Sequence, residues 1–249
     1  MNFKDIYSLV FLHRQSTGEP KENDFFVEVE GNIKVALRVY LRDKSFDNIL
    51  FFHGNGEICE EYDFIGEMFN KFDLNFIVSD FRGYGFSNGV SNRENLHSDS
   101  LKIFDYLSNY LLTNGYSRPI SVMGRSLGSA SACHIIANRI DEIKCCVIES
   151  GFSTEEFFFD LFNVAANNYE VKNGFENLRK ISNFNKPLYI IHADNDHIVP
   201  LSNGNNLYDM CPSPDKKRLI VKNANHNNII MILKDKYFMN IKNFIYGIN

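Results

Sequence analysis

The segment from Ile120 to Gly128 constrains the fold of this chain more than any other. An apolar run, Ile120 to Met123, leads into Gly124-Arg125-Ser126-Leu127-Gly128, and small residues follow at 129–132. This pattern predicts a strand, a tight turn with Ser126 at its apex, and a helix, because the glycines leave room for strained backbone and close packing. The N-terminus of such a helix favours negative charge. The geometry suits a nucleophile, although the five-residue pattern alone also occurs by chance.

From residue 48 onward, short apolar runs alternate with segments whose apolar residues recur at helical spacing. Runs that are apolar throughout are typical of strands buried on both faces of a parallel sheet. The expected strands are 48–52, 75–79, 119–123, 144–149, 187–191 and 218–221. The expected helices are 59–71, 96–112, 127–139, 201–210 and 227–246. This alternation predicts a doubly wound, mostly parallel α/β sheet with helices on both faces.

Two further features concern the organisation of the chain. Segments 25–30 and 33–41 alternate around Gly31-Asn32, which predicts an antiparallel hairpin at one edge of the sheet. No repeat or Pro/Gly-rich linker interrupts the 249 residues, so a single domain, 1–249, is expected. Segment 153–185 is too long for a simple loop, and it is either a small cap over the site or a crossover helix with a surface loop. We expect its aromatic cluster around Phe157 to belong to the core rather than to bind an acyl chain.

Composition excludes some classes of protein. The net charge of −5 and the lack of a basic stripe argue against a nucleic-acid partner, and the densest basic run, 216–218, is expected to be a solvated strand edge. Five cysteines with no metal or disulfide spacing indicate free thiols in a reducing compartment. We find no signal peptide and no apolar run of the ~20 residues that span a bilayer. A cytoplasmic protein without a stable membrane anchor is therefore expected.

A serine hydroxyl needs a base to take its proton, and the base needs an anion to orient it. In an open parallel sheet, functional groups gather at the carboxyl ends of the strands. Asp194 and Asp196 follow the expected strand 187–191, and His226 follows the strand 218–221. Ser126, Asp196 and His226 are therefore expected to meet at one edge of the sheet.

Several separate segments, found together and in this order, resemble the α/β-hydrolase superfamily over roughly residues 30 to 245. Within it, the chain is similar to the Bem46-like proteins and to the α/β-hydrolase domain-containing proteins 13 and 17, which are related to the serine aminopeptidase-like group. The segments are His53-Gly54-Asn55-Gly56, residues 80–87, Gly124-Arg125-Ser126-Leu127-Gly128, Asp196-His197-Ile198-Val199-Pro200 and Asn225-His226.

The resemblance implies the α/β-hydrolase fold and a role for each matching residue. Ser126 would be the nucleophile, His226 the general base and then the general acid, and Asp196 the orienting carboxylate. The oxyanion hole would be formed by the backbone N–H groups of Asn55 and Leu127. Substitution of either residue should be milder than Ser126→Ala, because the backbone and not the side chain donates.

The identity of the acid stays open between three residues. Asp194 lies two residues before Asp196, and Glu149, at the end of the preceding strand, occupies another place where such folds keep the acid. The match to Asp-x-Ile-Val-Pro favours Asp196. The neighbouring His192 and His197 suggest a metal cluster with these aspartates, but adjacent side chains do not converge easily, so no metal is expected.

Three other polar positions have expected structural roles. Arg82 precedes Gly83-Tyr84-Gly85 and should lie in a local polar network, while His53 should support its own loop. Glu57 faces either the substrate entrance or solvent at a helix start.

The sequence thus predicts a serine hydrolase that cleaves a carboxylic ester or thioester of a small-molecule acyl substrate through an acyl-Ser126 intermediate. No cofactor is implied, because each step is proton transfer or electrostatic stabilisation. Two alternatives remain: an aminopeptidase or acyl-peptidase-like amide hydrolase, and a non-catalytic interaction protein on a hydrolase scaffold.

Overall fold

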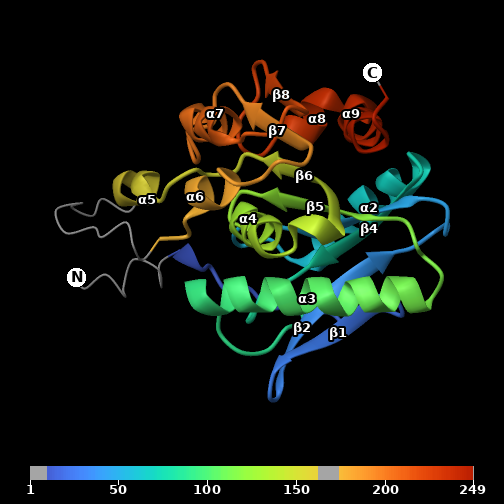
Figure 1. Ribbon diagram of the computed structural model, residues 1–249. Helices are drawn as coiled ribbons and strands as arrows, with labels where there is room; N and C mark the ends of the chain where they lie inside the picture. The colour runs from blue at the N-terminus through green and yellow to red at the C-terminus, as the bar shows by residue number, and fades with distance from the viewer. Residues whose placement is uncertain (1–9, 162–173, 249) are drawn as a thin grey trace.

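The computed structural model describes residues 10–161 and 174–248, which build one central sheet of eight strands with helices on both faces (Figure 1). The spatial order of the strands is β1-β2-β4-β3-β5-β6-β7-β8. The strands are β1 (Asp24–Glu30), β2 (Ile33–Tyr40), β3 (Asp47–Phe52), β4 (Leu74–Ser79), β5 (Ile120–Arg125), β6 (Ile143–Glu149), β7 (Leu188–Ala193) and β8 (Lys216–Val221). The α/β fold class expected from the sequence is confirmed.

The sheet is antiparallel at one edge and parallel elsewhere. β1 pairs with β2 and β2 with β4 in antiparallel register, whereas the five remaining neighbouring pairs, from β4 and β3 to β7 and β8, are parallel. Gly31 turns the β1–β2 hairpin with a φ of +51°, a conformation that glycine adopts without steric cost. The predicted edge hairpin is therefore confirmed.

The helices divide between the two faces of the sheet. They are α2 (Asp63–Lys71), α3 (Arg93–Thr113), α4 (Gly128–Asn138), α5 (Glu156–Leu161), α6 (Asn177–Ile181), α7 (Leu201–Met210), α8 (Ile229–Leu233) and α9 (Asp235–Tyr246), with short 3-10 turns η1 (Cys59–Tyr62) and η2 (Ile140–Glu142). One face packs against α3, α4, α6 and α7, and the other packs against α2, α8 and α9. None of the described helices has the length and apolarity needed to cross a membrane.

The central strands are buried on both faces, which explains their unbroken apolar runs. In β3, Leu50 belongs to the core under α3 and α4, while its neighbour Phe51 belongs to the core under α2 and α9. All six residues of β3 are buried. Since successive side chains point to opposite faces, a strand covered by helices on both sides has no position for a polar alternation.

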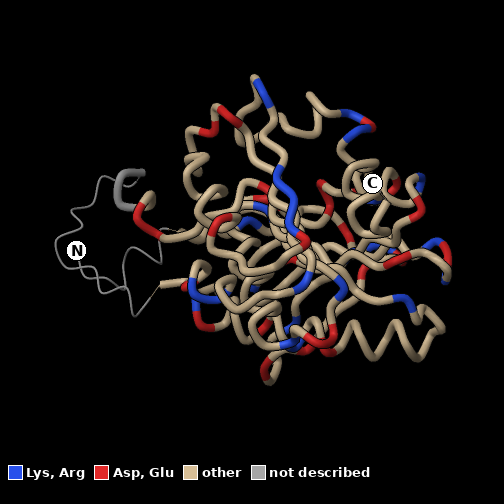
Figure 2. The backbone as a smooth tube through the Cα atoms, turned by 45° about the horizontal axis from the view of Figure 1, so that its top comes forward, with Lys and Arg blue, Asp and Glu red and all other residues tan. Residues whose placement is uncertain are grey.

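The charged residues fit the expected surface pattern. Basic and acidic positions are interspersed along the chain in Figure 2, and the basic run Lys216-Lys217-Arg218 lies in β8. β8 is the last strand of the sheet order, and the side chains of Lys217 and Arg218 are exposed. The interpretation of this run as a solvated strand edge is confirmed.

Two boundary predictions are wrong. The expected helix 227–246 is split into α8 and α9 by Lys234, whose φ of +51° is left-handed and interrupts the helical hydrogen-bond ladder. The expected strand 187–191 continues through His192 to Ala193 as β7, because β8 supplies paired residues along this whole length. His192 is thus a strand residue and not part of the following loop.

The segment 153–185 is described only in part. α5 and α6 belong to it, and its residues 162–173, which include Phe162 and most of the polar stretch, lie outside the described residues. Phe157 and Phe158 are buried against Phe152. These two rings therefore belong to the hydrophobic core, as expected.

Candidate active site

Ser126 lies at a strained turn between β5 and α4. Its φ is +50°, a left-handed conformation that is uncommon for a residue with a Cβ atom, and such strain clusters at functional sites. The turn is held on one side by the backbone of β6, since Ser126 N donates to Glu149 O over 3.0 Å. Ser129 donates to Ser126 O through both its N–H, at 3.0 Å, and its hydroxyl, at 2.6 Å.

The flanking glycines are required by close packing at this turn. A Cβ atom on Gly128 would overlap the carbonyl oxygen of Phe52 in β3, and one on Gly124 would overlap the carbonyl oxygen of Gly128. α4 can begin this close to the sheet only because these positions carry no side chain. The side chain of Ser126 is partly exposed at the edge where β5 ends.

Asp196 and His226 meet in the structure as the sequence predicts. His226 Nδ1 lies 2.8 Å from Asp196 Oδ2, and both side chains are almost completely buried. A carboxylate only accepts, so His226 Nδ1 carries the hydrogen and Nε2 is left as the acceptor when the ring is neutral. This tautomer is the one that a general base needs.

Asp196 is held as an anion by several donors. Its second oxygen, Oδ1, accepts the backbone N–H groups of Ile198 at 3.0 Å and Val199 at 2.8 Å. Burial opposes ionisation of Asp196, but the hydrogen bond from His226, the charge of that ring and the Val199 amide together lower the pKa of the carboxyl below its ordinary value. The carboxylate is therefore ionised when it orients His226.

Within the described part of the chain, Ser126 Oγ and His226 Nε2 are not joined by a hydrogen bond. Catalytic hydrogen bonds are often long in unliganded enzymes and tighten when substrate binds. The two residues nevertheless belong to neighbouring segments, because the side chain of Arg125 donates to His226 O over 2.8 Å. The roles of Ser126, Asp196 and His226 accordingly stay predictions.

The loop after β3 brings Asn55 to the same edge of the sheet. Neither Asn55 N nor Leu127 N forms a backbone hydrogen bond within the residues that the structure describes. Both amides are therefore unused donors, as an oxyanion hole requires. The Asn55 side chain accepts from Leu12 N at 2.9 Å and from the Tyr84 hydroxyl at 2.7 Å, so it anchors its own loop.

The other two candidate acids lie elsewhere. Asp194 contacts its neighbour Asn195 at 3.0 Å and approaches Lys222 no closer than 3.8 Å. Glu149 is bound by Arg125 and by the hydroxyl of Tyr237. Of the three, Asp196 is the carboxylate that the structure pairs with His226.

His192 is a second imidazole beside Asp196. Its Nε2 lies 2.9 Å from Val199 O and 3.5 Å from Asp196 Oδ2, and burial lowers its pKa. Because Val199 O can only accept, His192 Nε2 carries a hydrogen, and the His192 ring presents this polar N–H to the carboxylate of Asp196. Among the described residues, no group of three or more His, Cys, Asp or Glu side chains is arranged so that it could hold a metal ion.

Two of the three polar positions have the expected roles. His53 binds Gly54 O at 2.7 Å and Asp80 at 3.1 Å, and it supports its loop. Arg82 forms a two-point ion pair with Asp99 at 2.6 and 2.7 Å. Glu57 lines a cavity beside the serine turn, and its carboxylate is also bonded within the protein, as described below for Arg125; its place at a substrate entrance stays a prediction.

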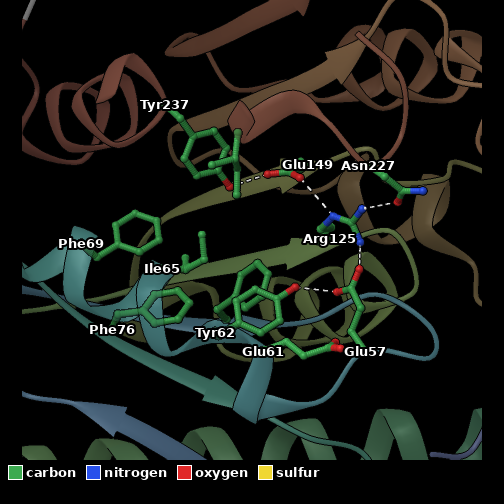
Figure 3. Close-up of a pocket in the computed structure, with 12 residues that line it drawn as sticks. Glu57, Glu61, Tyr62, Ile65, Phe69, Phe76, Arg125, Glu149, Asn227 and Tyr237 are labelled. Atoms are coloured by element: carbon green, nitrogen blue, oxygen red, sulfur yellow. Dashed lines mark hydrogen bonds and ion pairs between the residues drawn. The ribbon is translucent and has the colours of Figure 1, made fainter. Parts of the chain in front are cut away.

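Arg125 is the residue that sequence reasoning missed. It occupies the variable position of Gly-x-Ser-x-Gly, where no residue type is demanded, and its side chain joins two loops and the end of β6 (Figure 3). The signal that could have revealed it is its position: a charged residue at the end of a strand buried on both faces needs a partner inside the protein.

The α/β-hydrolase fold has this order of strands, a strained serine turn and a paired carboxylate and imidazole at the carboxyl edge. The similarity of the chain to known proteins agrees with this fold. The profile of the family described as "Serine aminopeptidase, S33" matches residues 43–156. The chain has the fold of the α/β-hydrolases and is similar in sequence to members of that superfamily.

The similar proteins include members of two of the protein groups that the sequence analysis named. Protein bem46 of Schizosaccharomyces pombe is 26% identical over 247 residues, which cover 93% of this chain and 81% of that protein. The α/β-hydrolase domain-containing protein 17B of Xenopus tropicalis is 28% identical, with 86% of this chain and 72% of that protein covered.

Solved structures show the same fold. The esterase Pf2001 of Pyrococcus furiosus superposes with a TM-score of 0.75 at 19% identity, over 94% of this chain and 95% of that one. Est1E of Butyrivibrio proteoclasticus superposes with a TM-score of 0.71 at 14% identity, over 91% of this chain and 98% of that one. The comparisons support a hydrolase.

Proposed function

We propose that the protein is a serine hydrolase that cleaves a carboxylic ester or thioester through an acyl-Ser126 intermediate. His226 Nε2 takes the proton of Ser126 Oγ while that oxygen attacks the carbonyl carbon of the substrate. The developing oxyanion accepts hydrogen bonds from Asn55 N–H and Leu127 N–H. His226 then protonates the leaving group, and in the second half it deprotonates the water that releases the acid.

The observation that carries the proposal is the pair formed by His226 and Asp196 beside the serine turn. The 2.8 Å contact fixes the tautomer in which Nε2 is free to accept a proton. The bonded, ionised carboxylate also stabilises the imidazolium that forms during attack. If the serine turn had only a structural role, it would not need a buried imidazole that a carboxylate holds in one tautomer.

A small cavity next to these residues supports a compact substrate. It has a volume of about 260 Å³, and it is lined by the sequence neighbours of Ser126 and His226, which are Arg125 and Asn227, and not by Ser126 or His226 themselves. Its apolar wall includes Tyr62 and Ile65, which Figure 3 labels, together with Ile230. This volume is at the lower end of ligand pockets, which span roughly 300–1,000 Å³, and favours a short acyl group over a long one.

The five cysteines bear on the cellular setting that we propose. All five are free and buried. A protein with no disulfide and an unpaired count of thiols is suited to a reducing compartment, and we therefore keep the cytoplasm as its proposed location.

The proposal is tested by a fluorophosphonate probe together with turnover of p-nitrophenyl esters from acetate to palmitate. We expect labelling of one serine in the wild type, no labelling of Ser126→Ala, and the highest kcat/KM with the short esters. Leu127→Ala is the matched control, because it changes a side chain beside the serine and leaves the donating backbone N–H. Equal labelling of wild type and Ser126→Ala would contradict the assignment.

An amide hydrolase of the aminopeptidase kind is the second candidate, and the description of the matching family favours it. Both reactions use the same serine, so labelling by the probe does not distinguish the two candidates. Turnover of aminoacyl p-nitroanilides, assayed beside that of the esters, does distinguish them. Absence of labelling and of both activities would instead favour a non-catalytic protein on this scaffold.

A further inference from the structure

Arg125 connects the turn of Ser126 to the loops that carry His226 and Asn55. It is the last residue of β5 and directly precedes Ser126, and its side chain is 11% exposed. Its guanidinium reaches the loop of His226, the loop of Asn55 and the end of β6 (Figure 3). The side chain has five N–H donors in a rigid plane, which allows one residue to bind several partners in fixed directions.

The first connection fixes the backbone of the proposed base. Arg125 Nη2 donates to His226 O at 2.8 Å and to Asn227 Oδ1 at 3.0 Å. Asp196 binds the ring of the same histidine at Nδ1. His226 is thus held at both ends, at its ring by Asp196 and at its carbonyl by the residue next to the nucleophile.

The second connection fixes the loop of the proposed oxyanion hole. Arg125 Nη1 forms an ion pair with Glu57. The other oxygen of Glu57 accepts Gly54 N at 2.7 Å and the Tyr62 hydroxyl at 2.5 Å. A Cβ atom on Gly54 would lie 2.7 Å from Arg125 Nη1, so the loop is packed directly against the guanidinium.

The third connection orients the guanidinium itself. Arg125 Nε donates to Glu149 Oε1 at 3.2 Å, and the other oxygen of Glu149 accepts from the Tyr237 hydroxyl. Glu149 is 2% exposed and Glu57 is 23% exposed. Because the arginine is bounded by fixed partners on several sides, its plane has one well-defined orientation relative to Ser126.

We propose that Arg125 is a positioning residue for catalysis, which sets the distance between Ser126, His226 and the Asn55 amide. The inference rests on the proposed function of the same site. Arg125 reaches the backbone carbonyl of His226 and not its ring, and therefore acts through the residues that it holds. Buried ion pairs contribute little net stability, so a purely structural purpose explains this arrangement poorly.

The decisive comparison is between two arginines at opposite ends of β5. Arg118 precedes the strand and pairs with the buried Asp47 at 2.8 Å, at the edge of the sheet far from the serine. Arg125→Met keeps most of the apolar stem and removes the four described donor contacts. Arg118→Met makes the same chemical change at the far edge, where it removes the described contact with Asp47. Melting temperature, kcat and KM with p-nitrophenyl butyrate are measured for both.

We expect Arg125→Met to lower kcat about 100-fold with KM changed less than about threefold, since a misplacement of 1 Å costs about that factor. Arg118→Met should lower the melting temperature and leave kcat at the wild-type value. Arg125→Lys should restore kcat only in part, because one ammonium cannot span the two loops and the end of β6. A wild-type kcat in Arg125→Met would overturn the proposal, as would a loss of kcat in Arg118→Met that is equally large.

Glu57→Gln keeps the test decisive if Arg125→Met does not fold. This variant retains an acceptor for Gly54 N and removes the ionic contact with Arg125. We expect a kcat about 10-fold lower with labelling by the fluorophosphonate probe still at one serine, and an unchanged kcat would overturn the proposal. A wild type that is neither labelled nor active would overturn the proposed function itself, whereas an active wild type with unaffected variants would overturn only the role of Arg125.

Discussion

Replacing Asp196 by asparagine isolates the contribution of one proton position. Asparagine has the shape of aspartate, and its Oδ1 can still accept the N–H groups of Ile198 and Val199. Its Nδ2 then faces His226 Nδ1 in place of the carboxylate oxygen that lies there at 2.8 Å. Since Nδ2 only donates, His226 Nδ1 becomes the acceptor and Nε2 carries the hydrogen.

This tautomer cannot take the proton of Ser126. The same substitution at the acid of a serine protease triad lowers kcat about 10⁴-fold, and we expect a loss of that order here. A factor of 10⁴ corresponds to about 5 kcal/mol of transition-state stabilisation, at 1.36 kcal/mol for each factor of ten. The loss should appear in kcat, with KM for p-nitrophenyl butyrate changed by less than about threefold.

Asp194→Asn is the matched control. It makes the same chemical change two residues away, at a carboxylate whose contacts are to Asn195 and Lys222. We expect its kcat to remain within about twofold of the wild type, because surface substitutions away from special contacts have small effects. Equal losses in the two variants, or a near-normal kcat in Asp196→Asn, would refute the reasoning.

Three further predictions concern packing, acid stability and thiol reactivity. Gly128→Ala should destabilise the fold by about 3 kcal/mol in urea unfolding, because its Cβ would overlap the carbonyl of Phe52; a loss below about 1 kcal/mol would contradict the packing argument. Burial lowers the pKa of His97 to about 2 and that of His134 to about 4, whereas the pKa of an unfolded histidine is about 6.5. Between these values the unfolded chain binds more protons than the folded protein, so the stability of the fold falls as the pH falls. Each histidine should then remove up to about 2 kcal/mol between about pH 7.5 and 5, and replacement of both by glutamine should flatten this slope; an unchanged slope would show that other groups cause it. Thiol reagents should leave the folded protein unmodified and active at neutral pH, because all five cysteines are buried and burial raises the pKa of Cys133 to about 12; rapid modification before unfolding would be the contrary result.

The parts of the fold that follow local rules were predictable from the sequence. Apolar runs such as Asn48 to Phe52 correspond to strands buried on both faces, and the Gly31-Asn32 turn corresponds to the edge hairpin. The glycines beside Ser126 indicated a close contact between helix and sheet. The structure shows that a side chain at either glycine would overlap a backbone carbonyl oxygen. These features depend on residues a few positions apart, so the sequence contains them directly.

Other features depend on partners that are distant in the sequence. Nothing local distinguishes Lys234 from other helical positions, and only its left-handed φ reveals the break between α8 and α9. The length of β7 is set by pairing with β8, which extended the strand to Ala193. Boundaries of this kind depend on tertiary contacts and not on local propensity.

The site shows the same division. The pairing of Asp196 with His226 was predictable because both follow strands of one sheet, so their loops share an edge. The role of Arg125 was not, because it depends on contacts with Glu57, 68 positions earlier, and with His226, 101 positions later. A variable position within a motif carries no signal until its partners are known.

Mass spectrometry of the acylated protein tests the central claim most directly. The protein is mixed with p-nitrophenyl acetate, quenched in acid within the first turnover and digested. The account predicts one acetylated peptide with the group on Ser126 in the wild type, and strongly reduced acetylation in His226→Gln. An acetyl group on another residue, or acetylation of Ser126 that proceeds equally fast without the imidazole, would contradict it.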